Sequence, residues 1–156
     1  MIEIDVPGFG VLRLSHLVLD FNGTLARDGR LQIGVRERLA ALSRELTIHV
    51  LTADTFGQAR VELAGIPCEL SILPKGGQDV GKRDYVTGLG ADTTAAAGNG
   101  RNDRLMLETA ALGIAVMLEE GAAVGAVTAA DVVCGSIGDA LDLLRHPLRL
   151  VATLRS

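Results

Sequence analysis

The chain has 156 residues, of which 48% are hydrophobic and only 3% aromatic, and its formal net charge is −4. This length predicts one domain with a sizeable core, built from Leu, Val, Ile and Ala. The acidic balance argues against nucleic acid as the main partner, because phosphate backbones attract basic surfaces. No apolar run reaches about 18 residues, so we expect no membrane span and no membrane partner. The first residues lack the basic segment of a signal peptide, which favours a cytoplasmic protein.

Apolar periodicity predicts a β-hairpin at the start and then strands that alternate with helices. In the hairpin, Ile2, Ile4 and Val6 alternate with acidic residues before a Pro-Gly turn. The expected strands are 16–20, 47–51, 69–73, 93–97, 114–118 and 132–133. The expected helices are 31–46, 56–63, 78–89, 104–112, 119–128 and 137–144. Pro147 is expected to end the last helix before a short apolar tail.

This alternation predicts the α/β class: a single Rossmann-like core with a mostly parallel sheet flanked by helices. We expect one domain over residues 1–156, with the hairpin at 1–14, the core at 16–145 and a tail at 146–156. No linker or composition shift suggests a large cap domain. The hairpin and the apolar tail could each form an interface, so a homo-oligomer is one expected assembly.

Polar residues follow three of the predicted strands. Asp20 ends the first core strand, Thr52 ends the next, and a Gly-Asn-Gly turn containing Asn99 follows the alanine-rich strand. Ligands of parallel sheets bind at the carboxyl ends of the strands, so these side chains are expected to converge at one edge. Each feature alone has a commoner structural explanation as a turn former or helix cap. Their order along the chain is what favours a site.

A phosphoryl-transfer site would use these residue types. Asp20 could attack phosphorus and carry an aspartyl-phosphate, which divides one difficult displacement into two easier ones. A divalent cation would offset the repulsion between Asp20 and a phosphate, and Mg²⁺ suits oxygen donors from Asp103, Asn99 and the backbone of Asn22. Gly23 would allow close approach of the backbone to the phosphate. The Thr52 hydroxyl and a lysine would hold phosphoryl oxygens.

The ordered set resembles the haloacid dehalogenase-like (HAD) superfamily, and most of all the phosphorylation domain of P-type ATPases and its soluble, stand-alone relatives. Residues 20–24 read Asp-Phe-Asn-Gly-Thr and match the DxxGT nucleophile loop. Residues 51–54 read Leu-Thr-Ala-Asp and are similar to the Thr-Gly-Asp loop, with Ala53 in place of Gly. Lys82 looks like the phosphate-clamping lysine, and residues 98–103 resemble the GDGxND loop. The resemblance covers roughly residues 16–145.

The resemblance implies a role for each matching residue. The implied catalytic residues are Asp20, Asn22, Thr52 and Lys82. The implied substrate-binding residues are Gly23, Thr24, Ala53 and Asn102. The implied ligands of Mg²⁺ are Asp20, Asn22, Asn99 and Asp103. Lys75 competes with Lys82 because it follows Pro74 at a strand end, whereas Lys82 has the spacing that the resemblance favours.

Two departures bear on activity. Asn22 stands where HAD phosphatases usually have a general acid/base, and Asn99 replaces an acid that the family uses on Mg²⁺. Without general acid/base catalysis, we expect a rate about 10²–10⁴-fold lower. The primary prediction is therefore a slow Mg²⁺-dependent phosphatase or phosphotransferase, a HAD-type phosphomonoester hydrolase without ATP-driven transport. Its partner would be a phosphorylated small molecule or a phosphoprotein.

Other interpretations stay open from the sequence. A catalytically weakened HAD-like domain could bind a phosphorylated ligand or regulate a protein partner. A response-regulator-like receiver would need an acidic pair at the end of its first strand, and none is found. A purely structural module is about as weakly supported as a receiver.

Overall fold

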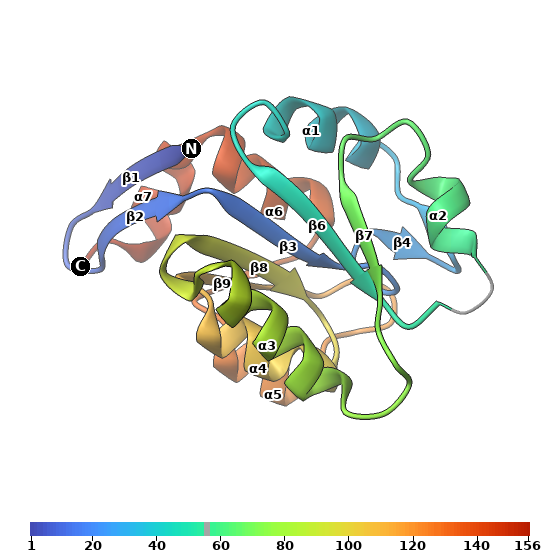
Figure 1. The fold of residues 1–156 in the computed structure, drawn as a ribbon. Coiled ribbons are helices and arrows are strands. Elements are labelled where there is room, and N and C mark those ends of the chain that lie inside the picture. Colours follow the sequence, from blue (N-terminus) through green and yellow to red (C-terminus); the bar gives the residue numbers. More distant parts are fainter. Residues whose placement is uncertain (55–56) are drawn as a thin grey trace.

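The computed structural model describes residues 1–54 and 57–156, and its centre is a parallel β-sheet of six strands (Figure 1). The strand order is β10-β9-β8-β3-β6-β7, and every neighbouring pair is parallel. The strands are β3 (His16–Asp20), β6 (Thr47–Thr52), β7 (Glu69–Ile72), β8 (Thr94–Gly98), β9 (Leu112–Val116) and β10 (Val132–Cys134). The predicted α/β fold with a mostly parallel sheet is confirmed.

Helices cover both faces of this sheet, which explains why its strands read as continuous apolar runs. In β3, Leu17 and Leu19 face one core cluster while Val18 faces the other, as the alternation of a strand requires. The first cluster lies under α1 (Val35–Leu42) and α6 (Ile137–Arg145). The second lies under α3 (Gln78–Leu89), α4 (Arg104–Thr109) and α5 (Val124–Ala129).

The predicted N-terminal hairpin is confirmed, and the C-terminal segment packs against it. Strands β1 (Ile2–Val6) and β2 (Gly10–Leu14) pair antiparallel. The expected apolar tail is instead a helix, α7 (Pro147–Leu154), which contacts β1. Proline is tolerated in the first turn of a helix because that N–H has no intrahelical partner, so Pro147 begins a helix after ending one. Both chain ends lie beside the hairpin in Figure 1, where the Ser156 N–H donates to the carbonyl of Pro7.

Two predicted helices are wrong at their starts. Residues Arg30–Leu31 form β5, which pairs antiparallel with β4 (Ala26–Arg27) through a turn in which Asp28 and Gly29 have positive φ. Helix α1 therefore begins only at Val35. Likewise, Leu118 to Gly121 form a turn, and α5 begins at Val124. The helix expected over 56–63 starts on a residue outside the described ranges, and its described part is α2 (Gln58–Glu62).

The chain order of the strands creates the crevice that holds the site. From β3 the chain adds β6 and β7 on one side, then crosses over through α3 to β8 on the other side. The switch point thus lies between the carboxyl ends of β3 and β8, where ligands bind in open parallel sheets. Short 3₁₀ turns flank β8 at Ala91–Thr93 and Arg101–Asp103. None of the described helices is long and apolar enough to cross a membrane.

Candidate functional site

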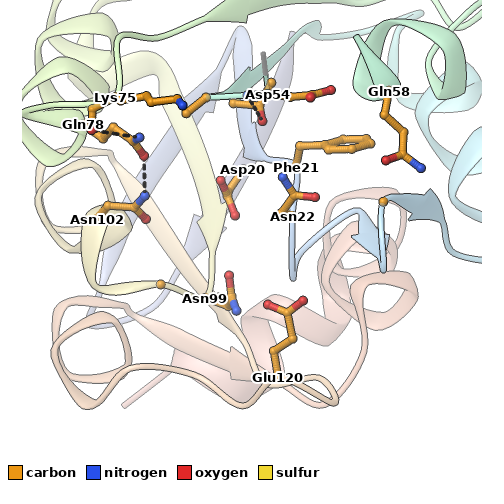
Figure 2. Close-up of a pocket in the computed structure, with 14 residues that line it drawn as sticks. Asp20, Phe21, Asn22, Asp54, Gln58, Lys75, Gln78, Asn99, Asn102 and Glu120 are labelled. Carbon is orange, nitrogen blue, oxygen red and sulfur yellow. Dashed lines mark hydrogen bonds between the residues drawn. The ribbon is translucent and has the colours of Figure 1, made fainter. Parts of the chain in front are cut away.

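A cavity of about 570 Å³ opens at the carboxyl edge of the sheet (Figure 2). Six of the residues singled out from the sequence line it: Asp20, Asn22, Thr52, Ala53, Asn99 and Asn102. They come from the ends of β3, β6 and β8 and from the turn that follows β8. The convergence expected from the strand ends is therefore observed, although the catalytic roles of these residues stay predictions.

A buried ion-pair triad forms the floor of the site. Nζ of Lys82 lies 2.8 Å from Oδ1 of Asp20 and 2.6 Å from Oδ1 of Asp103. Lys82 extends from α3 and is only 1% exposed, while Asp103 is fully buried. Of the two competing lysines, Lys82 therefore contacts Asp20, whereas Lys75 lies at the pocket wall.

Burial shifts the protonation of this triad. Desolvation, together with the charge of Asp103, raises the pKa of Asp20 from 3.8 to about 7, although Lys82 and Thr24 oppose that shift. For Lys82, burial alone would lower the pKa, but the two carboxylates outweigh it and the pKa is raised. Lys82 is thus a cation at neutral pH. Asp20 lies close to the point at which it changes between acid and carboxylate.

Asp103 holds the turn after β8 in place. Its Oδ2 accepts the backbone N–H groups of Asn99 at 3.0 Å and Gly100 at 2.8 Å, while its Oδ1 accepts from Lys82. A carboxylate with this many donors is well satisfied without a metal ion. The role of Asp103 as a ligand of Mg²⁺ stays a prediction. In the structure, its hydrogen bonds position Lys82 and Asn99.

Thr24 links the two halves of the site. Its hydroxyl lies 3.3 Å from Oδ2 of Asp20 and 3.4 Å from Oδ1 of Asn99, and it is fully buried. The single hydroxyl proton serves one of these oxygens at a time. On the other side of the amide, Nδ2 of Asn99 donates to the carbonyl of Gly121 at 3.3 Å. That bond sets the orientation of the amide, so Oδ1 of Asn99 faces Asp20.

The end of β6 provides a hydroxyl donor. Thr52 is 2% exposed, and its Oγ1 accepts the backbone N–H of Asp54 at 3.1 Å. Among the described residues no acceptor takes the hydroxyl proton of Thr52, so that proton could be donated to a bound ligand. The carboxylate of Asp54 accepts the N–H of Ala59 at 2.7 Å and so helps to begin α2. Ala53 lines the cavity between them.

Amide side chains form the wall nearest α3. Nδ2 of Asn102 donates to Oε1 of Gln78 at 2.7 Å, and Nε2 of Gln78 donates to the carbonyl of Lys75 at 3.4 Å. Figure 2 shows these three side chains together on one side of the cavity. This wall carries donors and one cation, which suits an anionic or hydroxyl-rich ligand.

Gly23 is required by the shape of the nucleophile loop. Its φ of +76° is disfavoured for other residues, and a Cβ there would lie 2.6 Å from Nδ2 of Asn99 and 2.6 Å from Oε2 of Glu120. The neighbouring side chains therefore use the space that a Cβ would fill. The predicted role of Gly23, close approach of the backbone to a phosphate, stays a prediction.

The donor set suits a hard divalent cation. Within residues 1–54 and 57–156, no three His, Cys, Asp or Glu side chains gather as a metal site. The oxygens that do face each other belong to Asp20 and Asn99, which share the Thr24 hydroxyl, with Asn22 lining the same cavity. Carboxylate, amide and backbone oxygens are the donors that Mg²⁺ accepts while keeping several waters.

Sequence reasoning missed three polar side chains that line the cavity, those of Glu120, Gln58 and Gln78. Glu120 follows β9, the strand beside β8, so the strand-end argument that selected Thr52 could have selected it as well. It was overlooked because residues from Glu119 onward were predicted as a helix. The two glutamines lie at the first turns of α2 and α3, a position that has no specific signature in a sequence.

Solved structures with a similar fold are HAD phosphatases and hydrolases. The cobalt-bound deoxy-D-mannose-octulosonate 8-phosphate phosphatase from Haemophilus influenzae matches with a TM-score of 0.72 and 15% identity over 92% of this chain and 94% of that chain. The 3-deoxy-D-manno-octulosonate 8-phosphate phosphatase from Moraxella catarrhalis, solved with magnesium, phosphate and KDO, matches with a TM-score of 0.70 and 13% identity, covering 91% and 94%. A putative HAD family hydrolase from Streptomyces avermitilis has a TM-score of 0.66 and 20% identity, covering 91% and 84%.

Two curated proteins of Methanocaldococcus jannaschii, both described as uncharacterized, are similar in sequence. MJ0073 is 50% identical over 60 residues, which is 38% of this chain and 64% of that protein. MJ0072 is 49% identical over 39 residues, which is 25% of this chain and 89% of that protein. No protein-family model matches the chain. The comparisons show that this chain has the HAD fold.

Proposed function

We propose that this chain, which has the fold of the HAD hydrolases, is a phosphatase or phosphotransferase that acts through an aspartyl-phosphate on Asp20. The observation that carries the proposal is the way in which neighbouring groups hold the Asp20 carboxylate at the end of β3. One oxygen of Asp20 is bonded to the buried Lys82, while the other faces the Thr24 hydroxyl and Asn99 beside the cavity. A carboxylate fixed in this way presents a single oxygen to a phosphorus atom.

The chain's own residues would carry the two steps. In the first, Oδ2 of Asp20 bonds to phosphorus and the bond to the leaving oxygen breaks. Because Asn22 has no proton of suitable acidity, that oxygen takes its proton from water. In the second, water attacks phosphorus and Asp20 leaves as a carboxylate. Lys82 keeps Oδ1 of Asp20 in place throughout, and the Thr52 hydroxyl donates to a phosphoryl oxygen.

The proposed reaction uses a bound divalent cation, and Mg²⁺ is the first candidate. Asp20, Asn99, Asp103 and the backbone carbonyl of Asn22 are the oxygen donors that would hold it. When bound, it neutralises charge between the carboxylate and the phosphoryl oxygens. The related folds solved with cobalt or magnesium support a divalent ion, because their fold matches this one over nine tenths of the chain.

For the substrate we propose a phosphorylated small molecule. Asp20 lies at the base of the cavity, and one wall is formed by amide side chains together with Lys75. That wall could bind the polar part of such a molecule. In the described residues only the β4–β5 hairpin lies between β3 and α1, so no large cap covers the cavity there. A phosphoprotein is the other substrate that an open cavity would admit.

The test is phosphate release from a small aryl phosphate, with and without Mg²⁺. We expect slow, Mg²⁺-dependent turnover that Asp20→Asn abolishes. Asp84→Asn is the matched control, since Asp84 pairs with Arg83 on the surface of α3. Unchanged turnover in Asp20→Asn would exclude Asp20 as the nucleophile.

Asn22 favours one second candidate, a weakened HAD-like domain that binds a phosphorylated ligand or regulates a partner. The exposed amide of Asn22 lines the cavity where an acid/base group would be needed. Calorimetric titration with Mg²⁺ and beryllofluoride, which together mimic an aspartyl-phosphate, separates the two candidates. Binding without any turnover supports the weakened domain, whereas robust turnover eliminates it.

A further inference from the structure

We propose that Glu120 supplies the negative charge that Asn99 lacks, so that Glu120 joins Asp20 and Asp103 as a carboxylate of the cation site. The inference rests on the proposed function, because it concerns the divalent cation used there. Glu120 lies in the turn after β9, and its carboxylate lines the same cavity as Asp20, Asn22 and Asn99. In Figure 2 the Glu120 side chain points toward Asn99 and the nucleophile loop.

The space above Gly23 brings the Glu120 carboxylate close to the Asn99 amide, whose Oδ1 is the atom that could face a cation. Oε2 of Glu120 and Nδ2 of Asn99 each lie 2.6 Å from the point where a Cβ of Gly23 would stand, and Oδ1 of Asn99 lies 3.0 Å from it. Three polar atoms from two separate turns thus surround one small space next to the nucleophile loop. Only a glycine at position 23 leaves that space open.

The amide of Asn99 itself holds this turn in place. Its Nδ2 donates to the carbonyl of Gly121, the residue after Glu120, at 3.3 Å. The backbone carbonyl of Asn99 accepts the N–H of Ala123 at 2.8 Å, and the N–H of Gly121 donates to Leu118 at 2.9 Å. An aspartate at position 99 could not donate to Gly121. Asn99 therefore contributes no charge itself, but its amide holds in place the turn that carries the charged Glu120.

The two adjacent glutamates have different surroundings. Oε1 of Glu119 accepts from Arg27 at 2.9 Å, which fixes it to the β4–β5 hairpin, and Glu119 does not line the cavity. Among the described residues, the Glu120 carboxylate has neither an ion pair nor a hydrogen bond with another side chain. This exposed carboxylate lines the same cavity as Asp20 and Asn99, so it could face a cation there directly or through one of the cation's waters.

The experiment measures binding of Mn²⁺ to the full chain by electron paramagnetic resonance, with Mg²⁺ as the competitor. We expect Glu120→Gln to raise the dissociation constant by about tenfold or more, in the range seen when groups that support a metal ion are removed. Glu119→Gln is the matched control: it removes the same charge one residue away and should leave the constant within about twofold. Equal constants for wild type and Glu120→Gln would overturn the inference.

A second variant tests charge rather than structure. Asn99→Asp in the Glu120→Gln background returns one carboxylate to the site and should recover part of the lost affinity. No recovery in a folded double variant would contradict the charge role and leave Glu120 with a positioning role only. If wild type binds neither Mn²⁺ nor Mg²⁺, the cation in the proposed function is wrong and this inference falls with it. Loss of affinity in Glu120→Gln, with wild type and Glu119→Gln still binding Mn²⁺, supports the inference and leaves the proposed cation standing.

Discussion

Lys82 and Asp20 are 62 residues apart in the chain, yet Nζ of Lys82 donates to Oδ1 of Asp20 across 2.8 Å in a nearly dry environment. The same ammonium group donates to Asp103. One cation thus lies between two carboxylates that would otherwise repel each other, and it fixes Oδ1 of Asp20 in place.

Replacing Lys82 by methionine should therefore damage both stability and turnover. Methionine is unbranched and one atom shorter than lysine, so the variant keeps most of the side-chain volume but leaves Asp20 and Asp103 facing each other without a cation. Breaking a buried pair of this kind costs about 3–5 kcal/mol. Urea unfolding measures the loss of stability, and aryl phosphate hydrolysis measures the loss of turnover. Lys75→Met is the control for stability, because Lys75 lies at the cavity wall and is not part of the buried triad. A larger effect from Lys75→Met would reverse the assignment of the two lysines.

The raised pKa of Asp20 predicts how stability depends on pH. Its folded-state value of about 7 lies above the ordinary 3.8, so between these values the folded state holds a proton that the unfolded state has lost. The contribution of Asp20 to stability is thus complete below pH 3.8 and is lost as the pH rises through about 7. Asp20→Asn has no titrating group at this position.

We therefore expect the stability of wild type, relative to Asp20→Asn, to fall between about pH 4 and pH 8 in the absence of metal. Urea unfolding of both proteins across this range gives the difference directly. A difference that stays constant with pH would show that Asp20 keeps an ordinary pKa in the folded protein.

Asn22→Asp should raise turnover. It places a titratable carboxyl group two residues after the nucleophile, where a proton could pass to the leaving oxygen. General acid/base catalysis contributes about 10²–10⁴-fold, and we expect the lower part of that range because the chain did not evolve around an acid here. Asn102→Asp is the control, since it adds the same charge to the other side of the cavity. A similar gain in both variants would point to a general effect of charge.

Gly23→Ala should weaken cation binding while the protein stays folded. A Cβ at 2.6 Å from both Asn99 and Glu120 forces those side chains out of position. Gly57→Ala provides the comparison, because Gly57 has a similar φ of +78° and, among the described residues other than its chain neighbours, no atom lies within 4 Å of its Cβ position. Both variants bear the cost of a left-handed residue, about 1–2 kcal/mol, so only crowding separates them. Titration with Mn²⁺ measures the difference.

The strand-end argument predicted much of the site because it depends on local pattern. Asp20, Thr52 and Asn99 each follow an apolar run, and parallel strands deliver their ends to one edge. The place of Lys82 in the site was harder to predict from the sequence. Only the three-dimensional structure shows that this side chain extends from α3 into the buried interior. Glu120 was missed because residues 119–123 have helix-forming composition, whereas hydrogen bonds from the turn at Leu118 and from Asn99 hold them in a loop.

The start of α1 shows the same limit of local pattern. Leu31 fits a helical apolar stripe, but the positive φ values of Asp28 and Gly29 allow residues 30–31 to pair with residues 26–27 instead. The two-residue turn Asp28-Gly29 is itself a hairpin signal, because Asp-Gly is a preferred pair in type I′ turns, but its flanking strands are only two residues long and the helical stripe outweighed it. At the other end, α7 was missed because Pro147 was read as the end of a helix rather than as a first turn.

The crossover from β7 to β8 divides the site between two parts of the chain. Asp20 and Thr52 belong to the part before α3, whereas Lys82, Asn99, Asp103 and Glu120 belong to α3 and the part after it. Neither part alone contains a nucleophile together with its counter-ion. The Asp20–Lys82 pair is therefore a marker of complete assembly: during synthesis, a carboxylate that could react with phosphate is made first, and it gains its neutralising partner only when the second part docks.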